Sequence, residues 1–364
     1  MLEVLFWGSV AFVLYVYAGY PLLLGVWAAF RRRVHQTTPQ ARGLRIRGGR
    51  DAQWPGVSII IAARNEAARL PQRIDNLLAS DYPLNRLQII VASDGSSDGT
   101  AAALAPYLDR IELLMLPPSG KASALNAAVE RARHPILVFA DARQRFASDA
   151  VSRLVRHFRT PQIGAVSGEL MLDGSGSTIG DGVGAYWNYE KWLRRREAIV
   201  GSTLGVTGAI YAMRRSLWQP LPPETLLDDV LGPIRVVLQG YQVTFDSDAH
   251  AFDEAPKDAE QELRRKMRTL AGNFQLLAQE PRLLVPGMNP VWLQFMSHKI
   301  GRLFVPYALL VIFATSAGLV TTSWFYALAF AAQLVFFALA VYGAALDRRE
   351  RLALGASRVK SEAA

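Results

Sequence analysis

The sequence predicts an α/β protein with a mainly parallel sheet in the middle of the chain and membrane-spanning helices towards its ends. Short runs rich in Val, Ile and Leu alternate with helical patterns through the middle of the chain, as in doubly wound sheets. Long uncharged runs lie near both ends, and about 20 apolar residues suffice to cross a bilayer. Polar residues directly follow several apolar runs, where such sheets bind their ligands.

The first apolar run, residues 1–30, predicts an N-terminal transmembrane helix that Pro21 bends. Its basic residues come after the apolar run, whereas a cleaved signal peptide carries them before it. We therefore expect an uncleaved anchor. Residues 31–54 then form a basic linker with seven arginines up to position 50, which the positive-inside rule places in the cytosol.

The central part of the chain, residues 55–282, predicts one sheet domain of alternating elements. Its apolar runs predict strands at Val57–Ala63, Leu87–Ser93, Ile111–Leu116 and Ile136–Ala140. Its helical patterns lie between them, at Glu66–Ala79, Asp98–Leu108 and Lys121–Arg133. A further strand is expected over Thr207–Met213, where Gly208 admits a close approach of the backbone.

The C-terminal part predicts a helix lying in the membrane interface over residues 283–302 and two transmembrane helices over 303–346. Residues 347–364 form a tail that the charge pattern places in the cytosol with the central domain. The alternative, a soluble protein with buried core helices, is disfavoured because the runs are long and uncharged.

The composition excludes several kinds of site. The 364 residues include no cysteine, so disulfides, thiolate nucleophiles and cysteine-bound metals are absent. The five histidines are widely separated, which argues against a zinc site. The net charge of +9 is concentrated in the linker and has no accompanying nucleic-acid motif, so we expect no nucleic-acid partner.

Three polar positions in the first half of the central domain are candidate ligand residues. Asp94 ends a strand and is not needed to cap the next helix, a role that fits Asp98. Gly120 and Lys121 open a helix, which suits a phosphate, although a lysine on a solvated helix is common. Asp141 leaves a buried apolar strand, which suits a divalent cation bound by oxygen ligands, Mg²⁺ or Mn²⁺.

The second half of the domain carries two further groups. Asp228 and Asp229 are adjacent carboxylates after a Pro-Pro turn; Asp229 is a candidate general base, and Asp228 is either its neighbour in the site or a helix cap. Gln261, Arg264 and Arg265 lie on a basic helix. They are candidate ligand residues, and the alternative is that they form a solvent-exposed basic face without a ligand.

In their order and spacing, these residues resemble the membrane-bound glycosyltransferases of family 2, which invert at the transferred carbon and have the GT-A fold. The resemblance to synthases of cellulose, hyaluronan and poly-N-acetylglucosamine covers nearly the whole chain. The motifs that carry it begin with Arg64-Asn65-Glu66 after the first strand, Ser93–Thr100, Gly120-Lys121 and Asp141, and continue with Thr207-Gly208, Asp228-Asp229 and Gln261–Arg265.

The resemblance implies a role for each matching residue. Asp229 is the catalytic base, with Asp228 in the place of the family's Glu, and Asp141 is the first carboxylate of the Asp-x-Asp metal motif. Gln261, Arg264 and Arg265 bind diphosphate and acceptor. The remaining positions bind the nucleotide sugar: Ala63, Asn65, Glu66, Asp94, Lys121, Arg143 and Gly208.

Besides Asp228 in the place of Glu, two further departures from the family pattern are visible. Arg143 replaces the second metal carboxylate, which leaves the number of protein ligands to the metal open, and it is a candidate to neutralise phosphate. Arg265 replaces the tryptophan of the Gln-x-x-Arg-Trp motif, which weakens the expectation of processive polymer synthesis. Two spans after the domain are also few for a polymer channel, so extrusion would need synthase-complex partners or a homo-oligomer.

The resemblance thus implies a multi-pass protein of the cell (inner) membrane that transfers a sugar from a UDP-sugar to a lipid-linked or polysaccharide acceptor in exopolysaccharide or cell-surface glycan biosynthesis. One alternative is a single transfer to a polyprenyl phosphate. The other is a non-catalytic, nucleotide-sensing subunit of a synthase complex. The sequence does not specify the sugar or the linkage.

Overall fold

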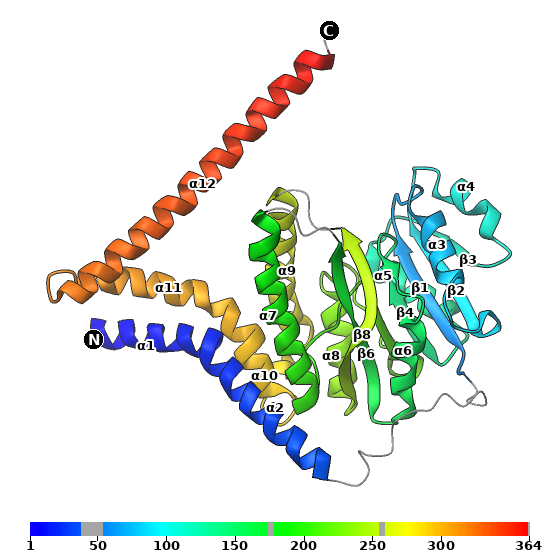
Figure 1. The fold of residues 1–364 in the computed structure, drawn as a ribbon, viewed down its shortest axis with the longest axis horizontal. Helices are drawn as coiled ribbons and strands as arrows, with labels where there is room; N and C mark the ends of the chain where they lie inside the picture. The colour runs from blue at the N-terminus through cyan, green and yellow to red at the C-terminus, as the bar shows by residue number, and fades with distance from the viewer. Residues whose placement is uncertain (38–53, 174–177, 255–258, 363–364) are drawn as a thin grey trace. The chain divides into compact units, whose positions relative to one another are not determined.

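The computed structural model describes residues 1–37, 54–173, 178–254 and 259–362, which belong to two compact units. One unit combines residues 1–20 with residues 300–364, and the other runs from Pro21 to Lys299. The described residues of the second unit form one sheet of eight strands (Figure 1).

The strands follow the order β3-β2-β1-β4-β7-β6-β8-β5 across the sheet. Their bounds are β1 Val57–Ala63, β2 Leu87–Asp94, β3 Glu112–Leu116, β4 Ile136–Ala140, β5 Arg145–Phe146, β6 Ile163–Asp173, β7 Ile210–Arg214 and β8 Gln242–Glu254. Strands β3, β2, β1 and β4 are parallel, as predicted. Strand β7 is antiparallel to both β4 and β6, so the sheet is mixed rather than a regular doubly wound one.

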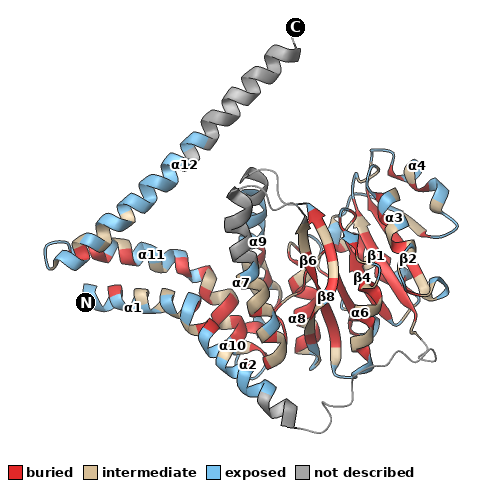
Figure 2. Cartoon of the chain, in the orientation of Figure 1, coloured by how far each residue is buried: buried red, intermediate tan, exposed pale blue. Residues whose placement is uncertain are grey.

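Helices cover both faces of the sheet. Their bounds are α3 Leu70–Leu78, α4 Thr100–Leu104, α5 Lys121–Arg131, α6 Ala150–Arg156, α7 Thr178–Val200, α8 Asp228–Leu238 and α9 Ala259–Gln279. Apolar side chains of α3 and α6 pack on the face that presents Ile59, Ile61 and Val138. Helix α5 packs on β1 and β2 from the other face, where Gln88 of β2 donates to the carbonyl of Arg131 at 3.1 Å. Strands β1, β2, β4 and β7 are therefore buried along most of their length (Figure 2).

Two of the predicted helices begin later than the sequence pattern suggested. Residues 66–69 form a turn in which the carbonyl of Glu66 accepts from the N–H groups of Arg69 and Leu70, and α3 starts at Leu70 with Pro71 in its first turn. Helix α4 starts at Thr100 because Gly99 has a φ of +83° and interrupts the helical geometry.

The apolar ends of the chain form three helices, within the described residues, that are long and apolar enough to cross a membrane: Leu2–Arg32, Trp292–Gly318 and Trp324–Gly343. The first contains α1 Leu2–Leu14, a π-helical turn at Tyr15–Gly19 and the start of α2 Tyr20–Thr37. The π turn ends two residues before Pro21, which cannot donate a backbone hydrogen bond. Residues 38–53 of the predicted linker lie outside the described residues.

The helix in the region predicted as interfacial, 283–302, begins later than predicted and continues into the apolar stretch that follows. A short 3₁₀ turn at Pro281–Leu284 is followed by one helical stretch, Trp292–Gly318, made of α10 Trp292–Gln294, a π-helical turn at Phe295–Ile300 and α11 Gly301–Gly318. Its basic residues His298 and Lys299 interrupt the apolar pattern without ending the helix. The last helix, α12, runs from Trp324 to Glu362 and so includes most of the predicted tail.

In the first unit, α1 and α11 pack side by side and α11 packs against α12. Phe6, Ile312, Leu319 and Tyr326 form its buried apolar cluster. The ring of Phe6 meets that of Tyr326 edge to face at 5.1 Å, so the contact is a specific aromatic one.

Candidate active site

The carboxyl ends of three neighbouring parallel strands bring two predicted site residues to one edge of the sheet. Ala63 at the end of β1 pairs in register with Ser93 of β2, and Ile61 pairs with Ala140 of β4. Asp94 and Asp141 therefore follow strands on either side of β1, at the edge where such sheets bind ligands.

Asp94 organises the loop that leads into α5. Its carboxylate is buried and accepts the N–H of Ser119 at 2.6 Å and that of Gly120 at 3.0 Å. Gly120 has a φ of +86°, which favours glycine. Asp94 thus fixes the start of the helix whose first residue is Lys121, and its predicted contact with the nucleoside remains a prediction.

The loops after β1 and β2 are tied together by side chains. Asn65 Oδ1 accepts the N–H of Ser97 at 2.8 Å, and Asp98 Oδ2 accepts that of Ala67 at 2.9 Å. Asp98 Oδ1 also accepts from the backbone N–H and the hydroxyl of Thr100, the first residue of α4. The cap of α4 is Gly99 rather than the predicted Asp98, which lies one residue before it. Glu66 pairs with Arg69 at 2.7 Å on the surface beside this loop.

Lys121 lies between two carboxylates from different halves of the domain. Its Nζ is 3.3 Å from Asp141 Oδ1 and 3.2 Å from Asp228 Oδ2. Burial opposes the charge of the lysine, but Asp228 and Asp141 outweigh it and raise the pKa of Lys121. The lysine is therefore protonated at neutral pH, and its ammonium lies where the carboxylates of Asp141 and Asp228 come close together.

Asp228 is not the cap of α8, since Leu227 precedes the helix and the Asp228 carboxylate turns to Lys121 instead. Its neighbour Asp229 lies in the same first turn, where the positive end of the helix favours a carboxylate. The chain at Gly208 passes so close that an added Cβ would lie 3.3 Å from Asp229 Oδ2. A second tie is the bond from the N–H of Val206 to the carbonyl of Asp229 at 2.9 Å.

The environment of Asp229 suits a proton acceptor. Burial is the largest influence and raises the pKa of Asp229, and the negative charge of Asp228 raises it further. Lys121, Lys299 and Arg194 counteract part of this shift. A carboxyl whose pKa is raised towards the working pH is a better general base than an ordinary aspartate.

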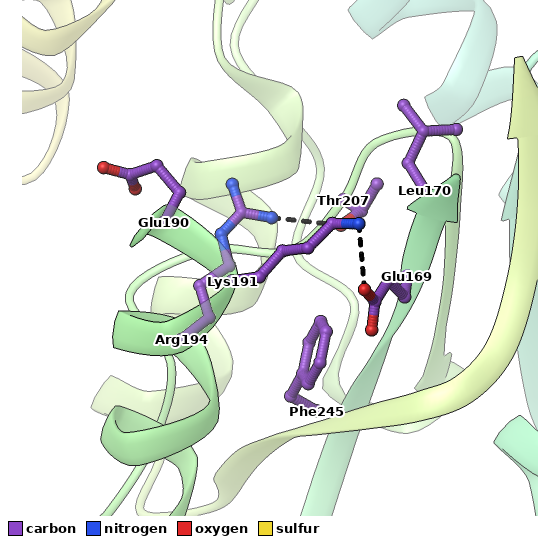
Figure 3. A pocket seen from close by; sticks show the side chains of 7 residues that line it. All are labelled: Glu169, Leu170, Glu190, Lys191, Arg194, Thr207 and Phe245. Atoms are coloured by element: carbon purple, nitrogen blue, oxygen red, sulfur yellow. Dashed lines mark hydrogen bonds and ion pairs between the residues drawn. The ribbon is translucent and has the colours of Figure 1, made fainter. Parts of the chain in front are cut away.

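A small cavity of about 10 Å³ adjoins the loop that carries Gly208, and its lining is mostly charged (Figure 3). Glu169 of β6 pairs with Lys191 of α7 at 2.9 Å, and Arg194 of α7 donates to the hydroxyl of Thr207 at 3.0 Å. Thr207 directly precedes Gly208, so α7 is connected to the loop against Asp229.

Sequence reasoning missed this contribution of α7, and it also missed Arg73. Arg73 lies on α3 at a position with core-facing spacing, is 2% exposed, and places its guanidinium 4.0 Å from the ring of Phe146. Burial lowers the pKa of Arg73 to about 9, and the charge of Asp141 acts in the opposite direction. An arginine among the apolar positions Leu70, Ile74 and Leu77 was the available signal.

Arg143 is engaged with a partner that the sequence did not suggest. Its Nη2 lies 2.6 Å from Asp253 Oδ2 of β8, and the carboxylate of Asp253 also accepts from Gln144 at 2.8 Å. The guanidinium that replaces the second metal carboxylate therefore forms an ion pair across the sheet. A role in binding phosphate requires Arg143 to exchange or share this partner.

The predicted diphosphate and acceptor residues lie on α9. Arg264 and Arg265 are exposed, while the side chain of Gln261 lies outside the described residues. The later part of α9 packs on the segment before Asp228: Gln275 Oε1 accepts the N–H of Leu226 at 2.8 Å. Helix α9 is thus anchored beside the candidate base at Gln275. Arg265 lies ten residues before Gln275, which is roughly 15 Å along the helix at 1.5 Å per residue.

The oxygen atoms around Lys121 fit a divalent cation of the Mg²⁺ or Mn²⁺ type. Asp141 and Asp228 both reach the lysine ammonium, so a positive charge is already held between two carboxylates. Within the described ranges, no group of three or more His, Cys, Asp and Glu is placed to hold a metal. Two carboxylates are nevertheless enough for Mg²⁺, which usually completes its shell with water and substrate phosphates.

Known proteins resemble this chain in sequence and in fold. A family model, Glycosyl transferase family 2, matches residues 58–220. A poly-beta-1,6-N-acetyl-D-glucosamine synthase of Staphylococcus epidermidis is 21% identical over 236 residues, which cover 63% of this chain and 57% of that protein. The chain thus spans little more than half the length of the first curated relatives that it matches, at 57% and 56%.

A shorter relative and a solved structure extend the comparison. An N-acetylglucosaminyltransferase of Rhizobium leguminosarum bv. trifolii is 34% identical over 128 residues, covering 33% of this chain and 70% of that protein. The solved structure of the mannosyltransferase PcManGT from Pyrobaculum calidifontis, in complex with GDP-Man and Mn²⁺, is 24% identical and covers 95% of this chain and 92% of its own, with a TM-score of 0.67. The predicted GT-A fold is confirmed. The matched family model spans the strands that lead into Asp94 and Asp141, and the Rhizobium protein is similar over most of its length: the chain belongs to glycosyltransferase family 2.

Proposed function

We propose that this chain is a membrane-bound glycosyltransferase that moves a sugar from a UDP-sugar to a lipid-linked or glycan acceptor, with inversion at the transferred carbon. The observation that carries the proposal is that two groups of charged side chains lie next to each other at one edge of the sheet. Lys121 with Asp141 and Asp228 is suited to a diphosphate that binds together with a divalent cation, and Asp229, next to Asp228, is suited to accept a proton.

The donor nucleotide occupies the loops after β1 and β2 in this proposal. Asn65 and Asp98 hold these two loops together, and Asp94 fixes the loop that presents Lys121. A site built from such cross-linked loops is preorganised, so little conformational entropy is lost when the nucleotide binds. Ala63, Glu66 and Gly208 are proposed to contact the donor from the surrounding positions.

The leaving diphosphate is stabilised by positive charge. Lys121 is the first such charge, because its ammonium already lies at the convergence of the two carboxylates. Asp141 and Asp228 are the residues that would hold Mg²⁺ or Mn²⁺; when bound, the cation supplies Lewis-acid stabilisation of the departing diphosphate. Arg264 and Arg265 on α9 are proposed to meet the diphosphate or acceptor from the other side.

Asp229 removes the proton from the acceptor hydroxyl. The new bond forms between the acceptor oxygen and the anomeric carbon as the bond from that carbon to the diphosphate oxygen breaks. The nucleoside diphosphate leaves with the bonding electron pair, and Asp229 later returns the proton to water. The close approach of Gly208 limits the movement of the carboxylate, so the base stays oriented for transfer.

The acceptor is proposed to enter beside the loop of Thr207 and Gly208, where α7 contributes Lys191 and Arg194. Lys191 is paired with Glu169, so Arg194 is the cation that favours an acceptor carrying phosphate at this position. It therefore supports a single transfer to a polyprenyl phosphate as the second candidate function. The length of the product chain separates this reaction from the synthesis of a polysaccharide.

The names of similar proteins support an N-acetylglucosamine donor. The Staphylococcus and Rhizobium relatives are named for N-acetylglucosamine, whereas the structural neighbour holds GDP-Man with Mn²⁺. Three helices among the described residues are apolar enough to span a bilayer. We therefore propose a multi-pass protein of the cell (inner) membrane with a cytosolic catalytic domain that acts alone, as a homo-oligomer or with synthase-complex partners.

The proposal is tested with the full chain purified in detergent and supplied with Mn²⁺ and a membrane lipid extract. Release of nucleoside diphosphate is measured across a panel of UDP-sugars and GDP-sugars, and products are analysed by mass. We expect one UDP-sugar to give acceptor-dependent release and a sugar-bearing product. Binding of nucleotides without turnover across the panel contradicts the proposal and favours the nucleotide-sensing alternative.

A further inference from the structure

A second cavity lies at the opposite ends of the strands that carry the candidate active site. It has a volume of about 200 Å³, and its lining includes Trp54 before β1, Ile136 at the start of β4, and Phe158, Arg159 and Arg214. Strand β1 is seven residues long, which at 3.3 Å per residue separates its two ends by roughly 20 Å. A ligand in this cavity is therefore distinct from the donor.

The walls of the cavity are held by the surrounding structure. The hydroxyl of Tyr82 donates to the carbonyl of Pro55 at 2.6 Å, and the ring of Trp54 lies against that of Tyr82 at 5.1 Å. On the other side, the N–H of Arg215 donates to the carbonyl of Pro135 at 2.9 Å. The cavity is thus framed by two prolines whose positions are fixed by hydrogen bonds.

One of its arginines carries a charge that no carboxylate compensates among the described residues. Arg214 donates through Nε and Nη2 to the carbonyls of Ile163, Phe158 and Thr160 at 2.8, 2.9 and 3.1 Å. These bonds hold the guanidinium in place, 5.4 Å from the ring of Phe158, and leave Nη1 for another acceptor. Such a fixed and uncompensated guanidinium favours an anion.

The other two arginines of the lining differ in their pairing. Arg156 pairs with the buried Asp246 at 2.9 Å, so its charge is largely neutralised. Arg159 is exposed and has no partner among the described residues. The cavity therefore presents Arg159 and Nη1 of Arg214 at its polar side, and Trp54, Ile136 and Phe158 at its apolar side.

We propose that this cavity is a second ligand site that takes a nucleoside phosphate, with the base among the apolar walls and the phosphate on Arg159 and Arg214. The volume supports a ring system, because a cavity of about 150 Å³ is enough to hold benzene. Aromatic side chains stack on bases of any kind. The guanidinium of Arg159 can bind phosphate through paired N–H groups, and Arg214 adds Nη1, since its Nε and Nη2 are bonded to carbonyls. An isolated phosphate would leave the apolar walls unused.

The test is equilibrium binding of radiolabelled GMP and AMP to the full-length protein in detergent. Four proteins are compared: wild type, Asp94→Ala, Arg159→Ala and Arg110→Ala. Asp94→Ala weakens the donor site, and Arg110 is an exposed arginine elsewhere on the domain that serves as the matched control. Because Arg159 is exposed, its replacement leaves the fold intact. The quenching of tryptophan fluorescence by GMP is also compared between wild type and Trp54→Phe. Because Trp54 lines the cavity, we expect less quenching in Trp54→Phe.

We expect saturable binding that persists in Asp94→Ala and Arg110→Ala and is weakened about tenfold in Arg159→Ala, as for the loss of one charged hydrogen bond. Binding that is lost in Asp94→Ala but unchanged in Arg159→Ala places the nucleotide in the donor site alone and overturns the proposal. Inorganic phosphate that competes as well as GMP overturns the role of the base. Displacement of GMP by phosphatidylglycerol vesicles, but not by other nucleotides, assigns the cavity to a lipid headgroup and also overturns it.

Discussion

Lys121 Nζ lies 3.2 Å from Asp228 Oδ2 and 3.3 Å from Asp141 Oδ1, so one ammonium joins carboxylates that are far apart in the sequence. The sequence has Arg143 where a second metal carboxylate was expected, and Arg143 is paired with Asp253. Asp228 of α8 instead brings a second carboxylate towards Asp141. We infer that the missing ligand of the motif is replaced in space by a residue from the second half of the domain.

The first prediction concerns this replacement. Asp228→Asn is expected to weaken Mn²⁺ binding in the presence of UDP at least about tenfold, as Asp141→Asn does, because each substitution removes one anionic oxygen ligand. The free Mn²⁺ signal in electron paramagnetic resonance measures the affinity without any turnover. Asp109→Asn, at an exposed site, is the control. Unchanged Mn²⁺ affinity in Asp228→Asn removes Asp228 from the ligand set.

The second prediction concerns the contact of Gly208 with Asp229. Gly208→Ala places a Cβ 3.3 Å from both Cβ and Oδ2 of Asp229, and we expect kcat to fall about tenfold or more because the base is displaced. Donor affinity, measured by calorimetry on the same samples, falls less than kcat does, because Gly208 is proposed to contact the donor as well as to orient the base. Gly232→Ala in α8 has room for its methyl group, 3.9 Å from Trp218, and keeps full activity. Equal activity of both variants disproves the positioning role.

The third prediction concerns stability and pH. Asp246 is buried, which opposes its charge, but bonds from His157 and from the N–H of Asp248, with the charges of His157 and Arg156, lower the pKa of Asp246 to about 2. A lowered carboxyl pKa adds stability that is present above the unfolded value of about 3.9 and is lost as pH falls towards 2. Asp246→Asn is thus expected to destabilise the domain by about 2 kcal/mol at pH 7.

Thermal unfolding in detergent, followed by tryptophan fluorescence, measures this effect. The difference in melting temperature between wild type and Asp246→Asn is constant from pH 7 to about pH 5 and shrinks below about pH 4. A difference that persists unchanged at pH 3 shows that packing, rather than ionisation of Asp246, is the origin.

The sequence predicted the strands well because their signal is local. The bounds of β1 and β4 agree with the prediction, since an uninterrupted Val, Ile and Leu run is typical of a strand buried on both faces. The direction of β7 was not predictable in this way, because an antiparallel strand between two others depends on long connections and not on its own residues.

The candidate site shows the same division. The positions of Asp94 and Asp141 at strand ends follow from local pattern. The contact of Lys121 with Asp228 and that of Arg194 with Thr207 join elements that are remote in sequence. A single sequence does not show how α5 and α8 are placed relative to each other. It therefore predicts which side chains belong to the site but not which of them are in contact.

The proposed sugar transfer depends most directly on Asp229 as its base. The decisive measurement is nucleoside diphosphate release by purified wild type and Asp229→Asn at saturating donor and acceptor, with donor affinity measured on the same samples. We predict that kcat falls about 100-fold to 10,000-fold, as for the loss of a general base, while donor affinity and the melting temperature are retained. Release by Asp229→Asn at the wild-type rate would contradict the account.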